Sequence, residues 1–394
     1  MLLMKKIIKF CLKFFTDESG LYWLKEIDLK FLYNFYFRSN DEFEYIKIKK
    51  KSYINLNLIK DLEKFYKINI KKFDKKNIAS EWLSNIETIF ESLFSSLNSG
   101  NSNKTEEILH NMMDTSLMHG LDYGNYLNKR NIKAMKLNSM FKLHGICQYL
   151  NLNNSLSDEG KNNLLSKKDY LSNLNIIKKR YDFKFFNSSM NNYQGLKIGE
   201  NIFNASDIQS LYSAIRIKET INQHFEVKKK INIAEIGGGY GKTALSHYMI
   251  NKDKINQIFL IDLLPMSILQ IYYFSKNMDI QKIWFPGCKR NFKNCKIIII
   301  PTDSISFLDN FNIDLYFNEN SFPEMKQKEL DKYIRQFKKN GRYLFSMNHE
   351  INTTSNQYVH ASISDSVKKF KAKLIDRRKN WLRVGYFESI FKNF

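Results

Sequence analysis

The chain has 394 residues, 43% of them hydrophobic, and its 62 basic residues outnumber its 40 acidic residues to give a formal net charge of +22 at pH 7. That length and composition can bury a large core, so they exclude a disordered tail and indicate two domains or one enlarged domain. The charge suits nucleic acid, an anionic membrane or a phosphorylated substrate as partner. Because the lysines are spread over most of the chain, a general compositional bias is favoured over a dedicated polyanion groove.

The first 15 residues, MLLMKKIIKFCLKFF, form an amphipathic pattern when placed on a helix. Lys5, Lys9 and Lys13 share one stripe, and apolar side chains fill the remaining arc. Such a helix could lie on an anionic membrane, where each lysine is attracted by about 1 kcal/mol. A first helix that docks on its own domain gives the same pattern, and we favour docking because core helices of this kind are more common.

The cysteines and the apolar runs bear on the cellular location. None of the four cysteines belongs to a C-x-x-C pair or has a histidine nearby at zinc spacing, so neither a disulfide framework nor a structural metal is predicted. Lysines interrupt the first apolar stretch too often for a signal peptide, and no run approaches the roughly 20 apolar residues of a membrane span. We therefore expect a cytoplasmic protein, with peripheral contact at the inner membrane face as a further option.

The front of the chain is predicted to be mostly helical. Apolar residues recur at three- and four-residue spacing in segments separated by Asn-, Ser- and Gly-rich stretches. These segments are residues 55–70, 78–98, 104–119 and 131–150. A break at residues 186–201 precedes a further helix with Asn204 or Ser206 as its cap. We therefore divide the chain into a mostly helical region, 1–190, expected to contact substrate or partners, and a second domain, 191–394.

Beyond residue 230, short apolar runs alternate with helical segments. The predicted strands are residues 231–236, 257–262, 296–300, 313–318 and 341–348. Strands that alternate with helices indicate an α/β fold with a parallel, doubly wound, Rossmann-like sheet, and residues 371–391 could supply a terminal antiparallel pair. In such sheets the ligand binds beyond the carboxyl ends of the strands.

Residues 231–250, INIAEIGGGYGKTALSHYMI, contain four glycines within five positions between the first of these strands and a helix. The GKT triplet suggests a phosphate-binding P-loop, but that loop needs a glycine five positions before Gly241, where the chain has Ile236. A dinucleotide fingerprint that begins at Gly237 needs a glycine where the chain has Lys242. Neither phosphate-binding motif is therefore present.

What remains is an acidic residue at the strand end followed by alternating glycines, namely Glu235, Gly237, Gly239 and Gly241. A pyrophosphate gains nothing from a carboxylate there, whereas a ligand with a sulfonium and an α-ammonium group is attracted to it. The carboxylate of such a ligand can meet free N–H groups of the turn. A glycine-rich turn without any ligand is the alternative, and the cost of each glycine, about 0.5 to 1 kcal/mol, disfavours it.

This segment resembles motif I of the class I S-adenosylmethionine-dependent methyltransferases, which implies S-adenosylmethionine as cofactor. Asp262 ends the second strand twenty-one positions after Gly241, about where an open α/β fold places an acid that holds ribose hydroxyls. The family commonly has Asp-Leu-Pro here, and this chain has one additional leucine before Pro265. The resemblance implies that Asp303, after the third strand, contacts the adenine amino group; capping of the following helix is the alternative.

A closer resemblance rests on four segments within residues 231–350: EIGGGYGK, LIDLLP, FNENSFPEM and LFSMNHE. Together they resemble the sugar O-methyltransferases associated with bacterial surface polysaccharide loci. The resemblance implies transfer of a methyl group to a sugar hydroxyl, with release of S-adenosylhomocysteine, in polysaccharide biosynthesis. The helical front would then be the family's N-terminal part.

A sugar hydroxyl is a poor nucleophile, so a base should take its proton while the site aligns oxygen, methyl carbon and sulfur. The candidate bases at strand ends are Glu319, Glu324, His349 and Glu350. We choose His349 first because a histidine normally titrates nearest to neutral pH. His247, one turn into the first helix of the sheet domain, is expected to be structural.

The segment after the fourth strand also supplies candidate substrate ligands. Glu324 resembles the family's glutamate before a methionine, and could bind sugar hydroxyls or act as the base. Asn320 and Ser321 could orient the substrate. Carboxylates and His349 converge here, but no ligand spacing argues for a metal.

Two other functions stay open at this point. A nucleic-acid methyltransferase suits the charge, and the basic tract at residues 368–383, with Trp381, could stack on RNA or form a solvated helix before an edge strand. The chain has NENSF where base amino methylation usually uses Asn-Pro-Pro-aromatic, so a nucleic-acid partner is not expected. A catalytically silent scaffold of a glycan assembly complex is the second alternative, and the intact Glu235, glycines and Asp262 argue against it.

Overall fold

The computed structural model describes residues 42–51, 55–118, 120–121, 132–152, 165–185, 189–227, 229–349, 361–383 and 385–393. The predicted helix at residues 1–15 and the candidate base Glu350 lie outside these residues. Contacts divide the chain into two compact units, each of them discontinuous in sequence. One unit comprises residues 1–50, 112–219 and 380–385, and the other comprises residues 51–111, 220–379 and 386–394.

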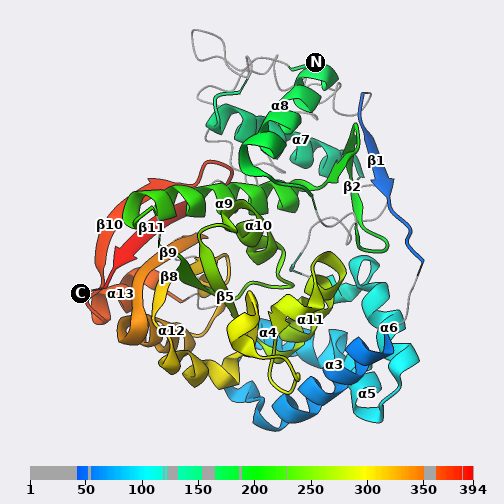
Figure 1. The fold of residues 1–394 in the computed structure, drawn as a ribbon, viewed down its shortest axis with the longest axis vertical. Helices are drawn as coiled ribbons and strands as arrows, with labels where there is room; N and C mark the ends of the chain where they lie inside the picture. The colour runs from blue at the N-terminus through cyan, green and yellow to red at the C-terminus, as the bar shows by residue number, and fades with distance from the viewer. Residues whose placement is uncertain are drawn as a thin grey trace, which may run out of the picture. The chain divides into compact units, whose positions relative to one another are not determined.

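An eight-stranded sheet forms the centre of the second unit, in the order β10-β11-β9-β8-β4-β5-β7-β6 (Figure 1). Strands β6, β7, β5, β4, β8 and β9 are parallel, whereas β11 runs antiparallel to both β9 and β10. The strands are β4 (Ile231–Ile236), β5 (Ile255–Asp262), β6 (Ile283–Trp284), β7 (Ile297–Pro301), β8 (Ile313–Glu319), β9 (Gly341–His349), β10 (Lys373–Lys379) and β11 (Tyr386–Lys392). The predicted Rossmann-like α/β sheet and its terminal antiparallel pair are confirmed.

The strand order reverses at β4, which has β5 on one side and β8 on the other. The chain runs outward from β4 to β5 and β7, then returns to pair β8 with the free side of β4. Helices connect these strands: α10 (Lys242–Asn251), α11 (Leu264–Asn277), the 3-10 helix η10 (Thr302–Asn310), α12 (Gln327–Asn340) and α13 (Ile363–Lys369). Because ligands of open α/β sheets bind at such a reversal, the carboxyl ends of β4, β5 and β8 mark the expected site.

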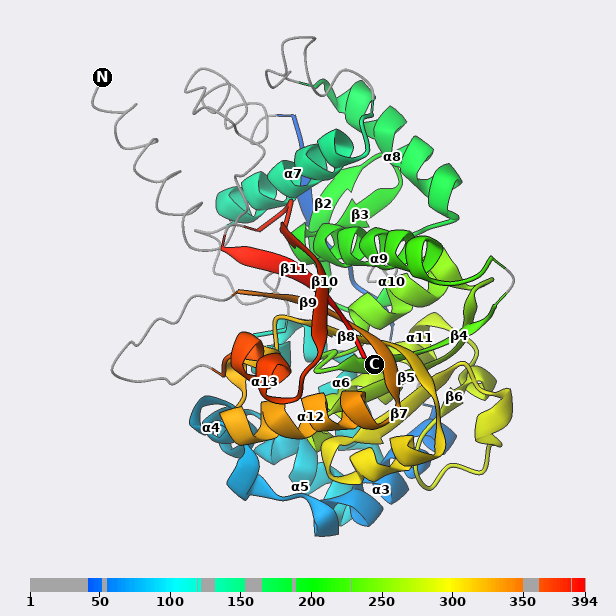
Figure 2. The same cartoon turned by 90° about the vertical axis from the view of Figure 1, so that its left-hand side faces the viewer.

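Helices cover both faces of this sheet because its inner strands are apolar on both sides. On one face, Ala234 and Ile236 of β4 belong to a buried cluster that includes side chains of η10, α12 and α13. Figure 2 shows α12 and α13 next to each other. Side chains alternate along a strand, so Glu235 points to the other face. There His247 of α10 packs edge-on against Phe317 of β8, with ring centroids 4.9 Å apart.

Four N-terminal helices also belong to the second unit, and Figure 1 shows them grouped beside α11. They are α3 (Leu56–Asn69), α4 (Ser80–Ile89), α5 (Glu91–Ser99) and α6 (Ser102–His110). Phe65 of α3 packs edge-on against Phe285, and the buried Glu106 carboxylate accepts a hydrogen bond of 3.3 Å from the Tyr272 hydroxyl. The segment predicted at residues 78–98 divides into α4 and α5 at Phe90. These contacts group the four helices with the sheet. The predicted domain boundary after residue 190, between a helical region and the sheet domain, stays a prediction.

The first unit contains a three-stranded antiparallel sheet and helices. Its elements are β1 (Glu44–Lys47), α7 (Ile132–Tyr149), α8 (Lys167–Tyr181), β2 (Gln194–Ile198), β3 (Asn201–Phe203) and the larger part of α9 (Ala205–His224). Of the two predicted caps of α9, Asn204 is the one in place, because its Oδ1 accepts the N–H groups of Ser206 and Asp207 at 3.0 and 3.1 Å.

The basic tract at residues 368–383 contains the end of a helix followed by an edge strand, as in the predicted alternative of a helix before an edge strand. Lys368 and Lys369 end α13, and β10 is an edge strand of the sheet. Trp381 belongs to the first unit, where its Nε1 donates a 2.8 Å hydrogen bond to the Gly145 carbonyl. The Trp381 side chain is half-buried and is anchored by this hydrogen bond.

Candidate active site

The glycine-rich turn joins β4 to α10 at the reversal of the strand order. Gly237, Gly239 and Gly241 have φ angles of 69°, 56° and 97°, in the left-handed region that favours glycine. A Cβ at Gly237 would lie 2.0 Å from Ser321 Oγ, and one at Gly241 would lie 2.5 Å from a ring carbon of Phe274. The turn therefore requires glycine for its backbone conformation and for close packing.

Hydrogen bonds from two neighbouring elements hold this turn in place. The Gly239 N–H donates to Asp262 Oδ2 at 2.8 Å, and the Gly239 carbonyl accepts from Gln270 Nε2 of α11 at 2.8 Å. The Gly237 N–H donates to the Ile261 carbonyl of β5, also at 2.8 Å. The turn is thus preformed by the protein itself. Gln270 was not among the predicted site residues, because nothing in the spacing of α11 distinguishes it from a core-facing polar residue.

Glu235 lies beneath the turn and not at an exposed strand tip. Its side chain is 2% exposed, and a Cβ at Gly238 would lie 3.1 Å from its Oε1. Glu235 Oε2 is buried and has no hydrogen-bond partner among the described residues. Burial raises the pKa of this carboxyl well above its usual range, and the charges of Glu319 and Asp262 raise it further. A buried carboxylate oxygen without a donor is a position where a cationic ligand would be stabilised.

Asp262 ends β5 and is 8% exposed. Burial raises its pKa to about 7, the N–H groups of Leu263 and Gly239 oppose this change, and the charge of Glu324 adds to it. The Leu263 N–H donates to Asp262 Oδ1 at 2.7 Å. Asp262 therefore links the ends of β4 and β5, and it is poised to change its protonation near neutral pH.

Asn318, which was not among the predicted site residues, connects three strand ends of the site through its side-chain hydrogen bonds. It is fully buried at the end of β8, and its Nδ2 donates to the Ile236 carbonyl at 2.7 Å and to Ser321 Oγ at 2.5 Å. Its Oδ1 accepts from Asn348 Nδ2 of β9 at 2.8 Å. One amide thus ties together the carboxyl ends of β4, β8 and β9. The available sequence signal was a polar residue that ends an otherwise apolar strand.

The two predicted substrate ligands form the sharp turn after β8. Asn320 has a φ of 68°, and its N–H donates to the Met347 carbonyl at 3.1 Å. Ser321 Oγ donates to the Ile236 carbonyl at 3.3 Å. Both residues therefore have a structural task in the turn, and Ser321 contacts the glycine-rich segment.

Two further carboxylates, Glu319 and Glu324, lie near Glu235 and Asp262 at the ends of the strands. Glu319 is the last residue of β8, and its charge raises the pKa of Glu235. Glu324 lies in the 3-10 helix η11 (Phe322–Glu324), and its charge raises the pKa of Asp262. The Glu324 carboxylate accepts a 3.0 Å hydrogen bond from Trp82 Nε1 of α4. Trp82 is thus a contact of this site from the helical front that the sequence did not reveal.

The two histidines of this region differ in environment. His349 is the last residue of β9, half-buried, with its ring 5.5 Å from that of Tyr386. It lies at the same sheet edge as Glu319. His247 is 1% exposed, burial lowers its pKa to about 3, and neither of its ring nitrogens has a hydrogen-bond partner among the described residues. A neutral, buried imidazole fits the structural role expected for His247.

Asp303 occupies the first turn of η10 and is half-buried. It is not the cap of that helix, because the cap position is Pro301, which makes no side-chain capping bond. Burial raises the pKa of Asp303, while Lys332 and the backbone N–H of Asp74 oppose the change. Asp303 therefore lies against the segment between α3 and α4.

The structure brings most of the predicted residues to one edge of the sheet, namely Glu235, the three glycines, Asp262, Glu319, Ser321 and Glu324. Among the described residues, no group of three His, Cys, Asp or Glu side chains could hold a metal ion. In the described part of the chain we find no helix with the length and apolar character that a membrane crossing requires.

Comparisons with known proteins find similar solved structures, whereas no protein-family model and no curated protein matches the sequence. An O-methyltransferase family protein from Burkholderia thailandensis is 9% identical, with a TM-score of 0.33 over 48% of this chain and 59% of that one. An S-adenosylmethionine-dependent methyltransferase from Aquifex aeolicus is 12% identical, with a TM-score of 0.31 over 46% of this chain and 90% of that one. An rRNA methyltransferase from Streptomyces viridochromogenes is 8% identical, with a TM-score of 0.30 over 45% and 83%.

All three matched proteins are less than 25% identical to this chain, with TM-scores below 0.5. The matches include RNA-modifying and O-methylating enzymes alike. They therefore give no support to the expectation that nucleic acid is not a partner.

Proposed function

We propose that this protein is an S-adenosylmethionine-dependent methyltransferase. The observation that carries the proposal is the preformed glycine turn above the buried Oε2 of Glu235, which has no hydrogen-bond partner within the described part of the chain, at the reversal of the strand order. A ligand with a positive sulfonium and ammonium group stabilises the ionised forms of Glu235 and Asp262, whose pKa values burial raises, whereas the phosphates of a nucleotide oppose their ionisation. The cofactor supplies an electrophilic methyl group when it is bound.

In this proposal each part of the cofactor has a partner in the chain. Gly237, Gly239 and Gly241 allow its amino-acid part to approach the turn, and Glu235 compensates its positive charge. Asp262 accepts hydrogen bonds from its ribose hydroxyls. Asp303 is proposed to contact its adenine amino group.

The proposed acceptor is a sugar hydroxyl, in line with the resemblance of the motifs at residues 235–242 and 317–325. With the cofactor bound, His349 would take the hydroxyl proton while the acceptor oxygen forms its bond to the methyl carbon and the carbon–sulfur bond breaks, which would give a methyl ether and S-adenosylhomocysteine. Glu324 and Glu319 are the further candidates for the base, and Asn320 and Ser321 orient the acceptor. We place the reaction in the cytoplasm, in surface polysaccharide synthesis, with residues 1–190 contributing to acceptor or partner contacts.

Calorimetric titration with S-adenosylmethionine tests the cofactor assignment. We expect saturable binding of S-adenosylmethionine and S-adenosylhomocysteine, and weak or no binding of NAD and ATP, because their phosphates meet two carboxylates. Binding of NAD in preference to S-adenosylmethionine would contradict the proposal. Absence of binding by all four compounds would favour the scaffold alternative.

Replacing His349 with alanine tests the base. We expect turnover to fall by about 10²- to 10⁴-fold while the affinity for S-adenosylmethionine stays within about twofold, because His349 lies at the end of β9 and not at the turn. Glu319→Gln and Glu324→Gln are the matched variants. If either of them abolishes turnover while His349→Ala is fully active, that glutamate is the base.

The acceptor class is tested by labelling cell-extract fractions with methyl-labelled S-adenosylmethionine and the purified protein. We expect label in acid-released sugars that survives ribonuclease treatment. RNA is the second candidate, favoured by the net charge of +22. Label that disappears with ribonuclease and returns as methylated nucleosides would establish the RNA alternative.

A further inference from the structure

A basic stripe lies on the exposed side of helix α3 and of the 3-10 helix η2 (Ile70–Lys72) that follows it, and we define it as Lys60, Lys64, Lys67 and Lys71. With 100° between successive residues, the three lysines of α3 fall within about 60° of one another, and Lys71 follows four residues after Lys67. The opposite side of α3 is apolar and buried, and includes Leu62. The stripe is therefore a fixed surface of the second unit, because the packing of α3 against its own core sets its direction.

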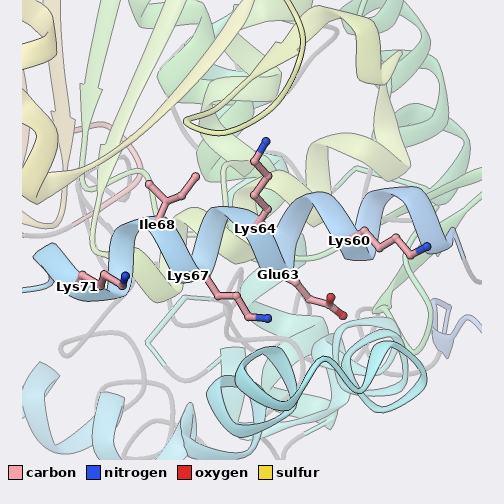
Figure 3. A pocket seen from close by; sticks show the side chains of 6 residues that line it. All are labelled: Lys60, Glu63, Lys64, Lys67, Ile68 and Lys71. Carbon is pink, nitrogen blue, oxygen red and sulfur yellow. The ribbon is translucent and has the colours of Figure 1, made fainter.

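The four lysines of the basic stripe line one surface hollow of about 470 Å³, together with Glu63 and Ile68. Figure 3 shows these side chains along α3 and η2, with Lys60 and Lys71 toward the two ends and Lys64 and Lys67 leaving the helix in different directions. All four lysines are exposed. None of the four has an ion-pair partner among the described residues, although Glu63 lies one turn away from Lys60 and Lys67.

Two acidic residues of α3, Glu63 and Asp61, contact partners outside the basic stripe, and neither forms an ion pair with its lysines among the described residues. Glu63 accepts a 2.8 Å hydrogen bond from Ser102 Oγ. Asp61 forms an ion pair of 3.6 Å with Arg290. The loop at Gly287, with a φ of 91°, approaches α3 so closely that a Cβ there would lie 2.7 Å from Ile68 Cδ1. This contact supports one edge of the hollow.

Exposed aliphatic side chains flank the basic stripe. Among the described residues five large hydrophobic side chains are exposed, and two of them, Leu56 at 50% and Ile68 at 36%, lie on α3. On the helix they fall on the two sides of the four lysines. A surface that combines lysines with exposed aliphatic groups matches the charge and the interface of an anionic bilayer. Single-stranded nucleic acid is usually held by aromatic rings between cations, and the hollow is lined by no aromatic residue.

We propose that α3 is a membrane-docking surface, whose basic stripe binds the headgroups of an anionic lipid bilayer while Leu56 and Ile68 contact its interfacial layer. This surface is separate from the helix expected at residues 1–15 and does not depend on the proposed methyl transfer. An attraction of about 1 kcal/mol per lysine corresponds to about a fivefold change in binding for each charge. The stripe as a whole therefore contributes on the order of a hundredfold or more at low salt.

Vesicle flotation with the full chain tests the proposal. One set of vesicles is phosphatidylcholine alone, and the other contains phosphatidylcholine and phosphatidylserine in a ratio of about three to one. We expect binding to the anionic vesicles only, decreasing as salt is raised. Changing all four lysines of the basic stripe to glutamine is expected to reduce that binding on the order of a hundredfold.

Two matched controls separate this surface from general charge and general hydrophobicity. The charge control changes four exposed lysines elsewhere to glutamine: Lys179, Lys230, Lys328 and Lys368. The aliphatic test compares Leu56→Ser with Val227→Ser, a residue that is 82% exposed outside α3. We expect the stripe variant and Leu56→Ser to lose binding and both controls to retain it. Circular dichroism and the affinity for S-adenosylmethionine report whether each variant is folded.

Several results would overturn the proposal. Equal loss in the stripe variant and the charge control means that net charge alone attracts the protein. Unchanged binding of the folded stripe variant places the membrane contact elsewhere, for example at residues 1–15. If labelled single-stranded RNA binds more tightly than the anionic vesicles at the same salt and the stripe variant loses it, the surface is a nucleic-acid site.

Discussion

The affinity for S-adenosylmethionine is expected to rise as the pH is raised toward 7, because binding favours the charged forms of Asp262 and Glu235. Burial raises the pKa of the Asp262 carboxyl to about 7. Ribose hydroxyls that donate to the carboxylate, and a positive charge nearby, stabilise its ionised form and lower that pKa. Below pH 7 the bound state therefore requires loss of a proton, which weakens binding by up to about tenfold per pH unit.

Calorimetry in buffers of different ionisation enthalpy measures this proton directly. We expect net proton release on binding near pH 6, with contributions from both Asp262 and Glu235. Asp262→Asn removes the titration and one of the acceptors for the Gly239 and Leu263 N–H groups. The variant should bind about 10- to 100-fold more weakly at pH 8, with a flatter pH profile. An Asp262→Asn protein with wild-type affinity and a wild-type pH profile would show that Asp262 is not part of the cofactor site.

The same carboxyl links stability to pH without any ligand. Its pKa in the folded chain, about 7, lies above its ordinary value of 3.8, so the folded protein holds the proton more tightly than the unfolded chain does. Its contribution to the free energy of unfolding is therefore fully present below pH 4 and is lost as the pH rises toward 7. Glu235, whose pKa is also raised, changes stability in the same direction. Asp262→Asn should thus reduce, and not abolish, the fall in unfolding free energy across this window.

The sequence was sufficient for those parts of the site that local patterns determine. Continuous apolar runs separated by helical segments located five of the six parallel strands and missed only the two-residue β6, and the spacing of Glu235, the glycines and Asp262 located the turn and its acidic neighbour. In each case the chain's own local conformation decides the outcome. A left-handed φ at Gly237 requires glycine wherever it occurs, so its position is visible in the sequence.

Contacts between segments that are distant in the sequence could not be predicted from local sequence patterns. Asn318 reaches Ile236, eighty-two positions earlier, and Trp82 reaches Glu324 from the helical front. No periodicity encodes such pairs, because they depend on how whole elements pack. The burial of Glu235 was missed for a related reason. Its position in β4 was evident, but the closure of the turn over its side chain follows from the packing of Gly238.

Replacing Gly237 with alanine is expected to abolish cofactor binding and to lower the melting temperature. The new Cβ would lie 2.0 Å from Ser321 Oγ and 2.5 Å from Ser321 Cβ, in a backbone region that alanine rarely adopts. The left-handed conformation costs on the order of 1 to 3 kcal/mol, and the overlap adds a similar amount. Relief of this strain would displace the turn from Asp262 and so disrupt the site. Thermal unfolding and calorimetric titration measure the two effects.

Two further variants separate the clash from the backbone strain. Gly100→Ala is the matched control, because Gly100 has nearly the same φ, 70°, while its nearest neighbour to a new Cβ is 4.0 Å away. It should lose only the stability attributable to the left-handed backbone and should keep full affinity for S-adenosylmethionine. Adding Ser321→Gly to Gly237→Ala removes both overlapping atoms, so the double variant should recover part of the melting temperature. If Gly237→Ala instead matches Gly100→Ala in stability and binds the cofactor normally, the turn tolerates a side chain and cannot be the close-fitting cofactor cradle proposed here.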